Sequence, residues 1–370
     1  MIIGVLREPS SETRVSLLPE AVATLTKKGI TVLVEAGAGI SASAPDENYV
    51  AAGAQLSSSA DIIANATIIL SVHLPAPTVP VGKVLVGVYQ PLFNFRHMAV
   101  LASGGLTVFS LDMLPRTTRA QSMDVLSSQA NIAGYKAVLL AANIFPRYFP
   151  MFMTAAGSIP PAKVLILGAG VAGLQAIATA RRLGAVVEVF DTRPAVKEEV
   201  MSLGAKFVEV EGAADASKAG GYAVEQSNDF LQKQKQKIAD SIAKADIVIT
   251  TAQIPGAPAP VLVTTAMVEA MKKGSVIIDL AAATGGNTAL TKDNETVNHK
   301  GVSIIGNSAL AASMPSDASK LYGKNVLNFL QLITGKDGQL NLNWEDDLVK
   351  GSCITHDSTV VNDRVKKLLS

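Results

Sequence analysis

The sequence feature that most constrains the fold is the stretch from residue 163 to residue 193, KVLILGAGVAGLQAIATARRLGAVVEVFDTR. An apolar run of strand type leads into a turn that carries Gly168, Gly170 and Gly173, and an alanine-rich stretch of helical type follows. A second apolar run then ends at Asp191, about 20 residues beyond the glycines. This order of strand, glycine turn, helix and strand predicts a βαβ unit with two parallel strands.

The spacing of the three glycines, G-x-G-x-x-G, is that of a dinucleotide-binding turn, and its surroundings favour NAD over NADP. The first glycine allows the tight turn, the second lets the backbone approach a pyrophosphate, and the third lets the helix pack on the strand. The helix N-terminus offers unpaired N–H groups to the phosphates. The carboxylate of Asp191 is placed to accept hydrogen bonds from ribose hydroxyls and would repel a 2′-phosphate, whereas Arg193 would attract one. The predicted cofactor contacts in this unit are Gly168, Ala169, Gly170, Val171, Gly173, Asp191, Thr192 and Arg193. The alternatives are a structural turn without nucleotide and an S-adenosylmethionine site.

Strand-type runs alternate with helical stretches along almost the whole chain, as a parallel sheet with crossover helices requires. The 370 residues suffice for two domains of ordinary size. The hydrophobic share of 48% fits parallel sheets that helices cover on both faces. We therefore expect an α/β fold of two doubly wound Rossmann-like domains with parallel sheets, and NAD(H) in the cleft.

Two long helical stretches predict where the chain passes between these domains. Apolar residues at helical spacing begin at Leu126, and a helix of about twenty residues after Pro315 is expected to return to the first domain. Its predicted apolar side carries Leu321, Val326 and Phe329. The expected domains are residues 1–126 plus 312–370, and the NAD(H)-binding residues 127–311.

Composition excludes several classes of protein. The net charge of +1 gives no basic face for nucleic acid. A single cysteine excludes an internal disulfide, and the four histidines lack metal-ligand spacing, so no metal is expected. The longest uncharged run, residues 247–268, contains three prolines and predicts a strand, a loop and a helix instead of a membrane span. We expect a soluble, cytoplasmic chain.

The loop before the first long helix, residues 116–127, is dense in polar side chains. It follows the last strand of the first domain, and ligands of open α/β sheets bind beyond the carboxyl ends of strands. Gln121 and Ser127 are suited to bond a carboxamide, and Arg116 is placed to pair with Asp124. The alternative is helix capping, with Ser122 as N-cap and Asp124 in the first turn.

Residues 116–137, 153–185 and 274–287 resemble domain I of proton-translocating nicotinamide nucleotide transhydrogenase. The resemblance implies an oxidoreductase and translocase in which this chain binds NAD(H) and exchanges hydride directly with NADP(H) on a separate domain III. It assigns Arg116, Gln121, Asp124 and Ser127 to the nicotinamide side, with Gln121, Arg116 and Asp124 at the hydride-transfer junction. It further assigns Asp191 and Arg193 to the adenosine ribose, Gly221 and Tyr222 to a mobile loop over the nucleotide, and Gln234 and Gln253 to weaker contacts.

The same resemblance implies partners. The NADP(H)-binding domain III and the membrane subunits would be separate chains, or this chain would be an excised domain. A homodimer that lies peripherally on the inner face of the plasma membrane is expected, with no nucleic acid involved.

Two competing functions stay open. The fold also resembles that of alanine dehydrogenase, which uses a lysine and a histidine on strand ends. His73 and Gln90 stand at those places here, so a free-standing amino-acid dehydrogenase lacks its acid/base pair, although Arg14 resembles that enzyme's carboxylate-binding arginine. Hydride transfer between two nicotinamides needs only that the rings lie together. The third possibility is a non-catalytic NAD-sensing module.

Overall fold

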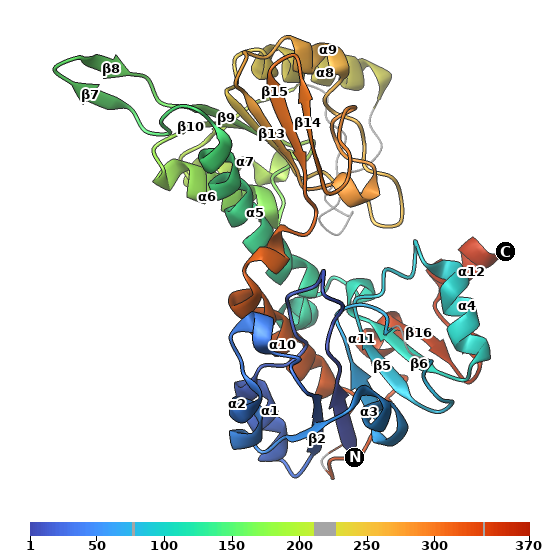
Figure 1. Ribbon diagram of the computed structural model, residues 1–370. Coiled ribbons are helices and arrows are strands. Elements are labelled where there is room, and N and C mark those ends of the chain that lie inside the picture. Colours follow the sequence, from blue (N-terminus) through green and yellow to red (C-terminus); the bar gives the residue numbers. More distant parts are fainter. Residues whose placement is uncertain (76–77, 211–226, 336) are drawn as a thin grey trace. The chain divides into compact units, whose positions relative to one another are not determined.

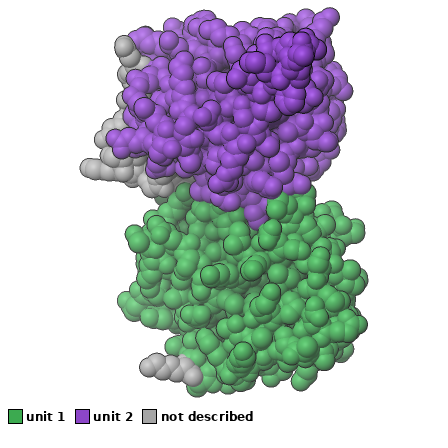
Figure 2. Space-filling view, turned by 90° about the vertical axis from the view of Figure 1, so that its left-hand side faces the viewer, with its two compact units in different colours: residues 1–129, 312–370 green, residues 130–311 purple. Residues whose placement is uncertain are grey.

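The computed structural model describes residues 1–75, 78–210, 227–335 and 337–370, which form two compact units (Figure 2). Unit 1 comprises residues 1–129 and 312–370, and unit 2 comprises residues 130–311. Each unit has its own sheet with helices around it, as Figure 1 shows. Each also has its own apolar core. The predicted fold class is therefore confirmed.

Unit 1 is built on an eight-stranded sheet in the order β3-β2-β1-β4-β5-β6-β16-β17. Its strands are β1 (Ile2–Val5), β2 (Thr31–Glu35), β3 (Gln55–Ser57), β4 (Ile68–Leu70), β5 (Val84–Gly87), β6 (Thr107–Ser110), β16 (Cys353–His356) and β17 (Thr359–Val360). The helices are α1 (Pro19–Thr26), α2 (Asp46–Ala51), α3 (Ser59–Asn65), α4 (Phe95–Ser103), α10 (Pro315–Leu330), α11 (Asp347–Ser352) and α12 (Asp363–Leu369). The first six strands are parallel, and β4 and β5 are buried throughout because apolar clusters cover both faces of the sheet.

Unit 2 holds a seven-stranded sheet in the order β11-β10-β9-β12-β13-β15-β14. Its strands are β9 (Lys163–Leu167), β10 (Val186–Phe190), β11 (Lys206–Phe207), β12 (Ile247–Thr250), β13 (Val276–Asp279), β14 (Glu295–His299) and β15 (Val302–Gly306). The helices are α5 (Val125–Ile144), which begins in unit 1, and α6 (Val171–Arg182), α7 (Lys197–Ser202), α8 (Asn228–Ile242) and α9 (Thr265–Glu269). The strand order reverses between β9 and β12, and ligands of such sheets bind beyond the carboxyl ends of strands at that point.

The structure corrects several details of the prediction. The sheets are not parallel throughout, because β14, β16 and β17 run antiparallel at the edges. Residues 151–162, for which the sequence indicated no strand, hold a hairpin of β7 (Phe152–Thr154) and β8 (Gly157–Ile159). Helix α10 is 16 residues long, and Leu321 is 39% exposed, whereas Val326 and Phe329 are buried as predicted. The prediction for Leu321 is wrong because the buried face of α10 runs through Tyr322, Val326 and Phe329, at the i, i+4, i+7 spacing of one helix face, and Leu321 lies off that face.

Cys353, the single cysteine of the chain, lies fully buried in β16. Burial raises the pKa of its thiol to about 12 because the thiolate would lose its hydration. Among the described residues, no helix combines the length and the apolar character that crossing a bilayer requires.

Candidate functional site

The three glycines of the turn between β9 and α6 differ in their steric surroundings. Gly168 has a φ of +107°, which L side chains rarely adopt, and a Cβ there would overlap the Thr251 hydroxyl. A Cβ on Gly173 would overlap the carbonyl oxygen of Gly168, so only glycine lets α6 lie this close to the strand. A Cβ on Gly170 would meet nothing within 4 Å. This turn therefore opens to its surroundings at Gly170 and is closed at the other two glycines.

Helix α6 starts without a side-chain cap. Gly170 is its N-cap and has no side chain, so no capping side chain accepts from the first N–H groups, and the first residue, Val171, is 38% exposed. Twelve residues of aligned peptide dipoles add partial positive charge at this end. The start of α6 thus has the donors and the open backbone that a pyrophosphate needs.

Asp191 follows β10, and the protein already uses its carboxylate. Oδ2 accepts a hydrogen bond from the Ala169 N–H at 2.7 Å, and the Arg193 guanidinium donates to Oδ1 at 2.9 Å and to Oδ2 at 2.7 Å. The Asp191 side chain is only 6% exposed. The hydrogen bond with Asp191 raises the pKa of Arg193 against the opposing effect of burial. Asp191 and Arg193 were predicted as ribose contacts, and the structure adds that they pair with each other, with the partly buried Thr192 between them.

Two residues that the sequence did not point to complete this edge of unit 2. Thr251 follows β12 and donates from Oγ1 to the Gly168 carbonyl at 3.1 Å, and Asn287 accepts at Oδ1 from the Ala252 N–H at 3.0 Å. Gln253, a predicted contact, donates from Nε2 to the Leu280 carbonyl at 3.0 Å. These residues lie more than 80 positions from the glycine turn, and no local motif marks them.

Gln234 lies on the inner side of α8, where it is 6% exposed. Its Oε1 is buried and finds no hydrogen-bond partner among the described residues. A buried acceptor without a partner is costly, so this atom is suited to a donor that a ligand brings. Gly221 and Tyr222, predicted for the mobile loop, lie outside the described residues.

The 116–127 loop contains a 3-10 helix, Thr118–Met123, directly before α5. Asp124 immediately precedes α5 and accepts hydrogen bonds from the Ser127 N–H at 2.9 Å and the Ser127 hydroxyl at 2.6 Å. The prediction of Ser122 as N-cap is wrong, because Asp124 has that position and bonding. Arg116 and Gln121 are exposed, while Ser127 is committed to Asp124.

In unit 1, the carboxyl ends of β1 and β4 carry a cluster of charged side chains. Arg14 donates from Nε and Nη2 to Glu12 and from Nη1 to Gln129, at 2.7–2.9 Å. His73 Nε2 lies 2.7 Å from Glu12. Burial acts to raise the pKa of Glu12, but the hydrogen bonds from Arg14 and His73 outweigh it and hold that pKa well below its ordinary range. Arg14 and His73 are thus both bonded to the Glu12 carboxylate.

His73 and Gln90, which stand where the sequence resemblance places the lysine and histidine of alanine dehydrogenase, do not form an acid/base pair. His73 is 52% exposed and bonded to Glu12, and Gln90 is exposed with a φ of +49°. Within the described ranges, no three His, Cys, Asp or Glu side chains gather as a metal site would require.

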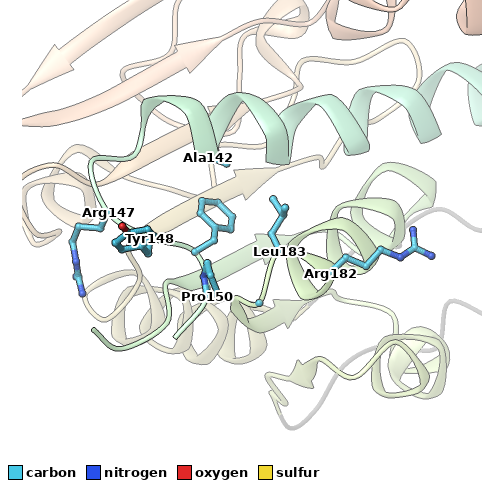
Figure 3. Close-up of a pocket in the computed structure, with 8 residues that line it drawn as sticks. Ala142, Arg147, Tyr148, Pro150, Arg182 and Leu183 are labelled. Atoms are coloured by element: carbon cyan, nitrogen blue, oxygen red, sulfur yellow. The ribbon is translucent and has the colours of Figure 1, made fainter. Parts of the chain in front are cut away.

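Two hollows of unit 2 lie away from the glycine turn. One of about 520 Å³ lies below the end of α5, next to the chain that follows α6 (Figure 3). Its lining is Ala142, Arg147, Tyr148, Phe149, Pro150, Arg182, Leu183 and Gly184. A second, of about 580 Å³, shares Arg147 and Tyr148 and reaches Ser158 and Ile159 of the β7–β8 hairpin. The first is lined by the chain that leads into the hairpin, and only the second reaches the hairpin itself.

Comparison with known proteins matches nearly the whole length of the chain. The family model described as Alanine dehydrogenase/PNT, N-terminal domain, matches residues 4–133, and that of the C-terminal domain matches residues 137–363. A Rickettsia prowazekii protein, named as the first part of NAD(P) transhydrogenase subunit alpha, is 45% identical over 98% of this chain and 96% of its own. The crystal structure of a Sinorhizobium meliloti transhydrogenase has a TM-score of 0.89 at 45% identity and covers 98% of this chain and 100% of that one. An L-alanine dehydrogenase structure has a TM-score of 0.82 at 26% identity, with coverage of 100% and 99%.

Proposed function

Because the chain belongs to the Alanine dehydrogenase/PNT family, we propose that it is the NAD(H)-binding component of a proton-translocating transhydrogenase. It exchanges hydride directly with NADP(H) on a partner domain, and membrane subunits couple that exchange to proton translocation. The relatives at 45% identity are named for a transhydrogenase, whereas an alanine dehydrogenase from Mycolicibacterium smegmatis is 26% identical.

The observation that carries the proposal is the glycine turn of unit 2. Its open side at Gly170 and the uncapped start of α6 suit a pyrophosphate. The orphaned acceptor of Gln234 suits a group that donates. The dinucleotide therefore fits the residues present. Asp191, a carboxylate at the strand end, favours NAD(H) over NADP(H), although the ion pair with Arg193 partly neutralises the negative charge of that carboxylate.

When bound, the nicotinamide supplies or accepts the hydride, and the chain's residues bind and orient it. We assign the pyrophosphate to Gly168, Ala169, Gly170, Val171 and Gly173, and the adenosine ribose to Asp191, Thr192 and Arg193. The nicotinamide side belongs to Arg116, Gln121, Asp124 and Ser127, with further contacts from Gly221, Tyr222, Gln234 and Gln253. Transfer between two nicotinamide rings needs juxtaposition and no protein acid or base.

An amino-acid dehydrogenase is the second candidate, because unit 1 retains Arg14 at the carboxyl end of β1. Its guanidinium is already bonded to Glu12 and Gln129, and His73 is bonded to Glu12. Imine chemistry on an amino acid requires a proton donor and acceptor beside the substrate. This arrangement supports the transhydrogenase over the dehydrogenase.

The proposal includes partners and a location. The chain acts with an NADP(H)-binding domain III and membrane subunits, peripherally on the inner face of the plasma membrane, as a homodimer. Support for the homodimer comes from the β7–β8 hairpin, where Met151, Phe152 and Met153 are 62%, 44% and 74% exposed. Exposed apolar side chains that gather on one hairpin are typical of a surface that another chain covers.

The test mixes the full chain with a transhydrogenase domain III and follows reduction of an NAD analogue by NADPH. We expect exchange that depends on both chains, and no NADH oxidation by pyruvate and ammonium without domain III. Gln121→Asn should slow exchange at least roughly tenfold while the Kd for NADH changes little, since Gln121 is assigned to the transfer junction.

Three outcomes would count against the proposal. Pyruvate-dependent oxidation by the chain alone favours the dehydrogenase. Tight NADH binding without exchange favours the sensing module. Equal losses of exchange and binding in Gln121→Asn remove that residue from the junction.

A further inference from the structure

The peptide group between Gly168 and Ala169 is held at both of its ends. Its N–H, on Ala169, donates to Asp191 at 2.7 Å, and its C=O, on Gly168, accepts from the Thr251 hydroxyl at 3.1 Å. The same hydroxyl lies 3.3 Å from the Leu167 carbonyl, so the Gly168 carbonyl is the nearer of its two acceptors. The same carbonyl lies against Gly173 so closely that a Cβ there would overlap it. The orientation of this peptide decides where the next N–H groups point. Gly168 has no Cβ and a positive φ, so other orientations of the peptide are sterically accessible.

Thr251 is itself held in place by hydrogen bonds of its own backbone and of the residue that follows it. Its N–H donates to the Leu167 carbonyl at 2.9 Å, and the next residue, Ala252, is bonded through both its N–H and its C=O to the Asn287 side chain, at 3.0 and 2.8 Å. Asn287 is fully buried, and its Nδ2 also donates to the Pro260 carbonyl at 2.9 Å. Every polar atom of the Asn287 amide therefore has a partner.

Asp279, at the end of β13, anchors the chain of bonds. Its buried carboxylate accepts from the N–H groups of Ala281, Asn287 and Thr288 at 2.8–3.0 Å and from the Thr291 hydroxyl at 2.6 Å. Four donors hold the charge that burial would otherwise disfavour. A continuous series of hydrogen bonds thus runs along the carboxyl edge of the sheet, from Asp279 through Asn287 and Ala252 to Thr251.

We propose that Thr251 is a positioning residue, which holds the Gly168–Ala169 peptide in the orientation that presents the start of α6 to the pyrophosphate. Asn287 and Asp279 hold Thr251 in place. This inference rests on the proposed function, since it assigns Thr251 to the same nucleotide site. Thr251 itself contacts the turn and not the nucleotide. Without its hydroxyl the peptide samples other orientations, and the apparent Kd rises as the competent fraction falls.

The test compares Thr251→Val, which keeps the shape and removes the donor, with Thr251→Ser, which keeps the donor. The matched control is Thr250→Val, because Thr250 is the adjacent, fully buried threonine whose hydroxyl has no partner among the described residues. We expect Thr251→Val to raise the Kd for NADH and for ADP-ribose roughly tenfold. Adenosine lacks phosphate, and its inhibition constant, measured by competition with NADH, should change less than about twofold. Thr251→Ser should keep most of the affinity for NADH and ADP-ribose.

A second measurement needs no nucleotide. Amide hydrogen exchange of residues 167–173 should accelerate in Thr251→Val and stay as in the unsubstituted chain in Thr250→Val, with unfolding temperatures recorded for each variant. Unchanged exchange in Thr251→Val, or equal loss of affinity for NADH and adenosine, overturns the inference. If the unsubstituted chain binds no NADH, the proposed function fails, and the exchange comparison still decides whether Thr251 holds the turn.

Discussion

Gly170 and Gly173 are three positions apart in one motif, yet their steric surroundings differ: one is open and the other is closed. Gly173 is closed in by the Gly168 carbonyl, whereas Gly170 has an ordinary φ of −77° and open space at its Cβ position. A methyl group at Gly173 has to displace packed backbone. A methyl group at Gly170 displaces only what binds there.

This contrast predicts the outcome of two alanine substitutions. Gly170→Ala should change the free energy of unfolding by less than about 1 kcal/mol, because alanine restricts the unfolded chain but is a poorer N-cap than glycine. Its Kd for NADH should rise more than roughly tenfold, as the added methyl group occupies the pyrophosphate approach. Gly173→Ala should lower the free energy of unfolding by about 1–3 kcal/mol through overpacking. Urea unfolding and NADH fluorescence titration measure both. If Gly170→Ala binds NADH as tightly as the unsubstituted chain, the assignment of the pyrophosphate to this turn is wrong.

At the same scale, the sequence identified the residues of the turn but not their mutual bonds. The motif predicted Gly168, Gly170, Gly173 and Asp191, since each has a fixed place in the order of strand, turn, helix and strand. The pairing of Asp191 with Arg193 and Ala169 depends on side-chain conformations that no spacing encodes. Thr251 could not be found because strand order, not chain order, brings β12 beside β9.

Among the elements, the β7–β8 hairpin is the one to which the proposed homodimer contact is assigned. It pairs with no other described strand and projects from the rest of unit 2 (Figure 1). Tyr148 stacks on Phe152 with ring centroids 5.0 Å apart, which gives the hairpin a firm base. Its apolar side chains remain exposed beyond that base.

Replacing Phe152 and Met153 together by serine should shift the proposed homodimer toward monomer, because exposed apolar area drives such association. Sedimentation velocity at several concentrations measures the change. The matched control is Ile40→Ser, which removes a 65% exposed side chain of unit 1 and should leave the mass unchanged. A dimer that survives the double substitution would place the interface elsewhere.

Elements with strong local patterns were predicted well, and edge elements were not. Buried strands such as β9 and β12 are continuous apolar runs, so their residues alone indicate them. The antiparallel strands β14, β16 and β17 mix polar with apolar residues, so their own residues do not mark them, and they pair where a neighbouring strand offers its edge. The hairpin has no buried face, so no hydrophobic pattern marks it.

For the molecule as a whole, the transhydrogenase resemblance predicted from three segments is confirmed by matches over nearly the full chain. Two doubly wound sheets also followed from the alternation of strands and helices. The C-terminal segment returns to unit 1, where α10 buries Tyr322, Val326, Phe329 and Leu330 in the same core as β1 and β4. Unit 1 is therefore built from both ends of the sequence.

Truncation after Ala311 should leave unit 1 unfolded and unit 2 folded. Removing the four buried side chains of α10 costs about 1.5–3 kcal/mol each, against a total stability of about 5–15 kcal/mol. It also removes β16 from the edge of β6. Limited proteolysis with mass spectrometry should show rapid cleavage within residues 1–124 and protection of residues 145–205. A chain that lacks only α12, in which Val365 is the one buried residue, should stay protected in residues 1–124 and in residues 145–205. Protection of residues 1–124 after the longer truncation would contradict this account.

The burial of Cys353 makes the folded protein chemically silent toward thiol reagents. Maleimides and disulfide reagents attack the thiolate, and a thiol with a pKa of about 12 and no exposed surface offers almost none near neutrality. A cysteine introduced at an exposed position such as Gln121 or Met153 would therefore take up a fluorophore or spin label alone. Pairs of such labels would turn this chain into a molecular ruler without removing its native cysteine.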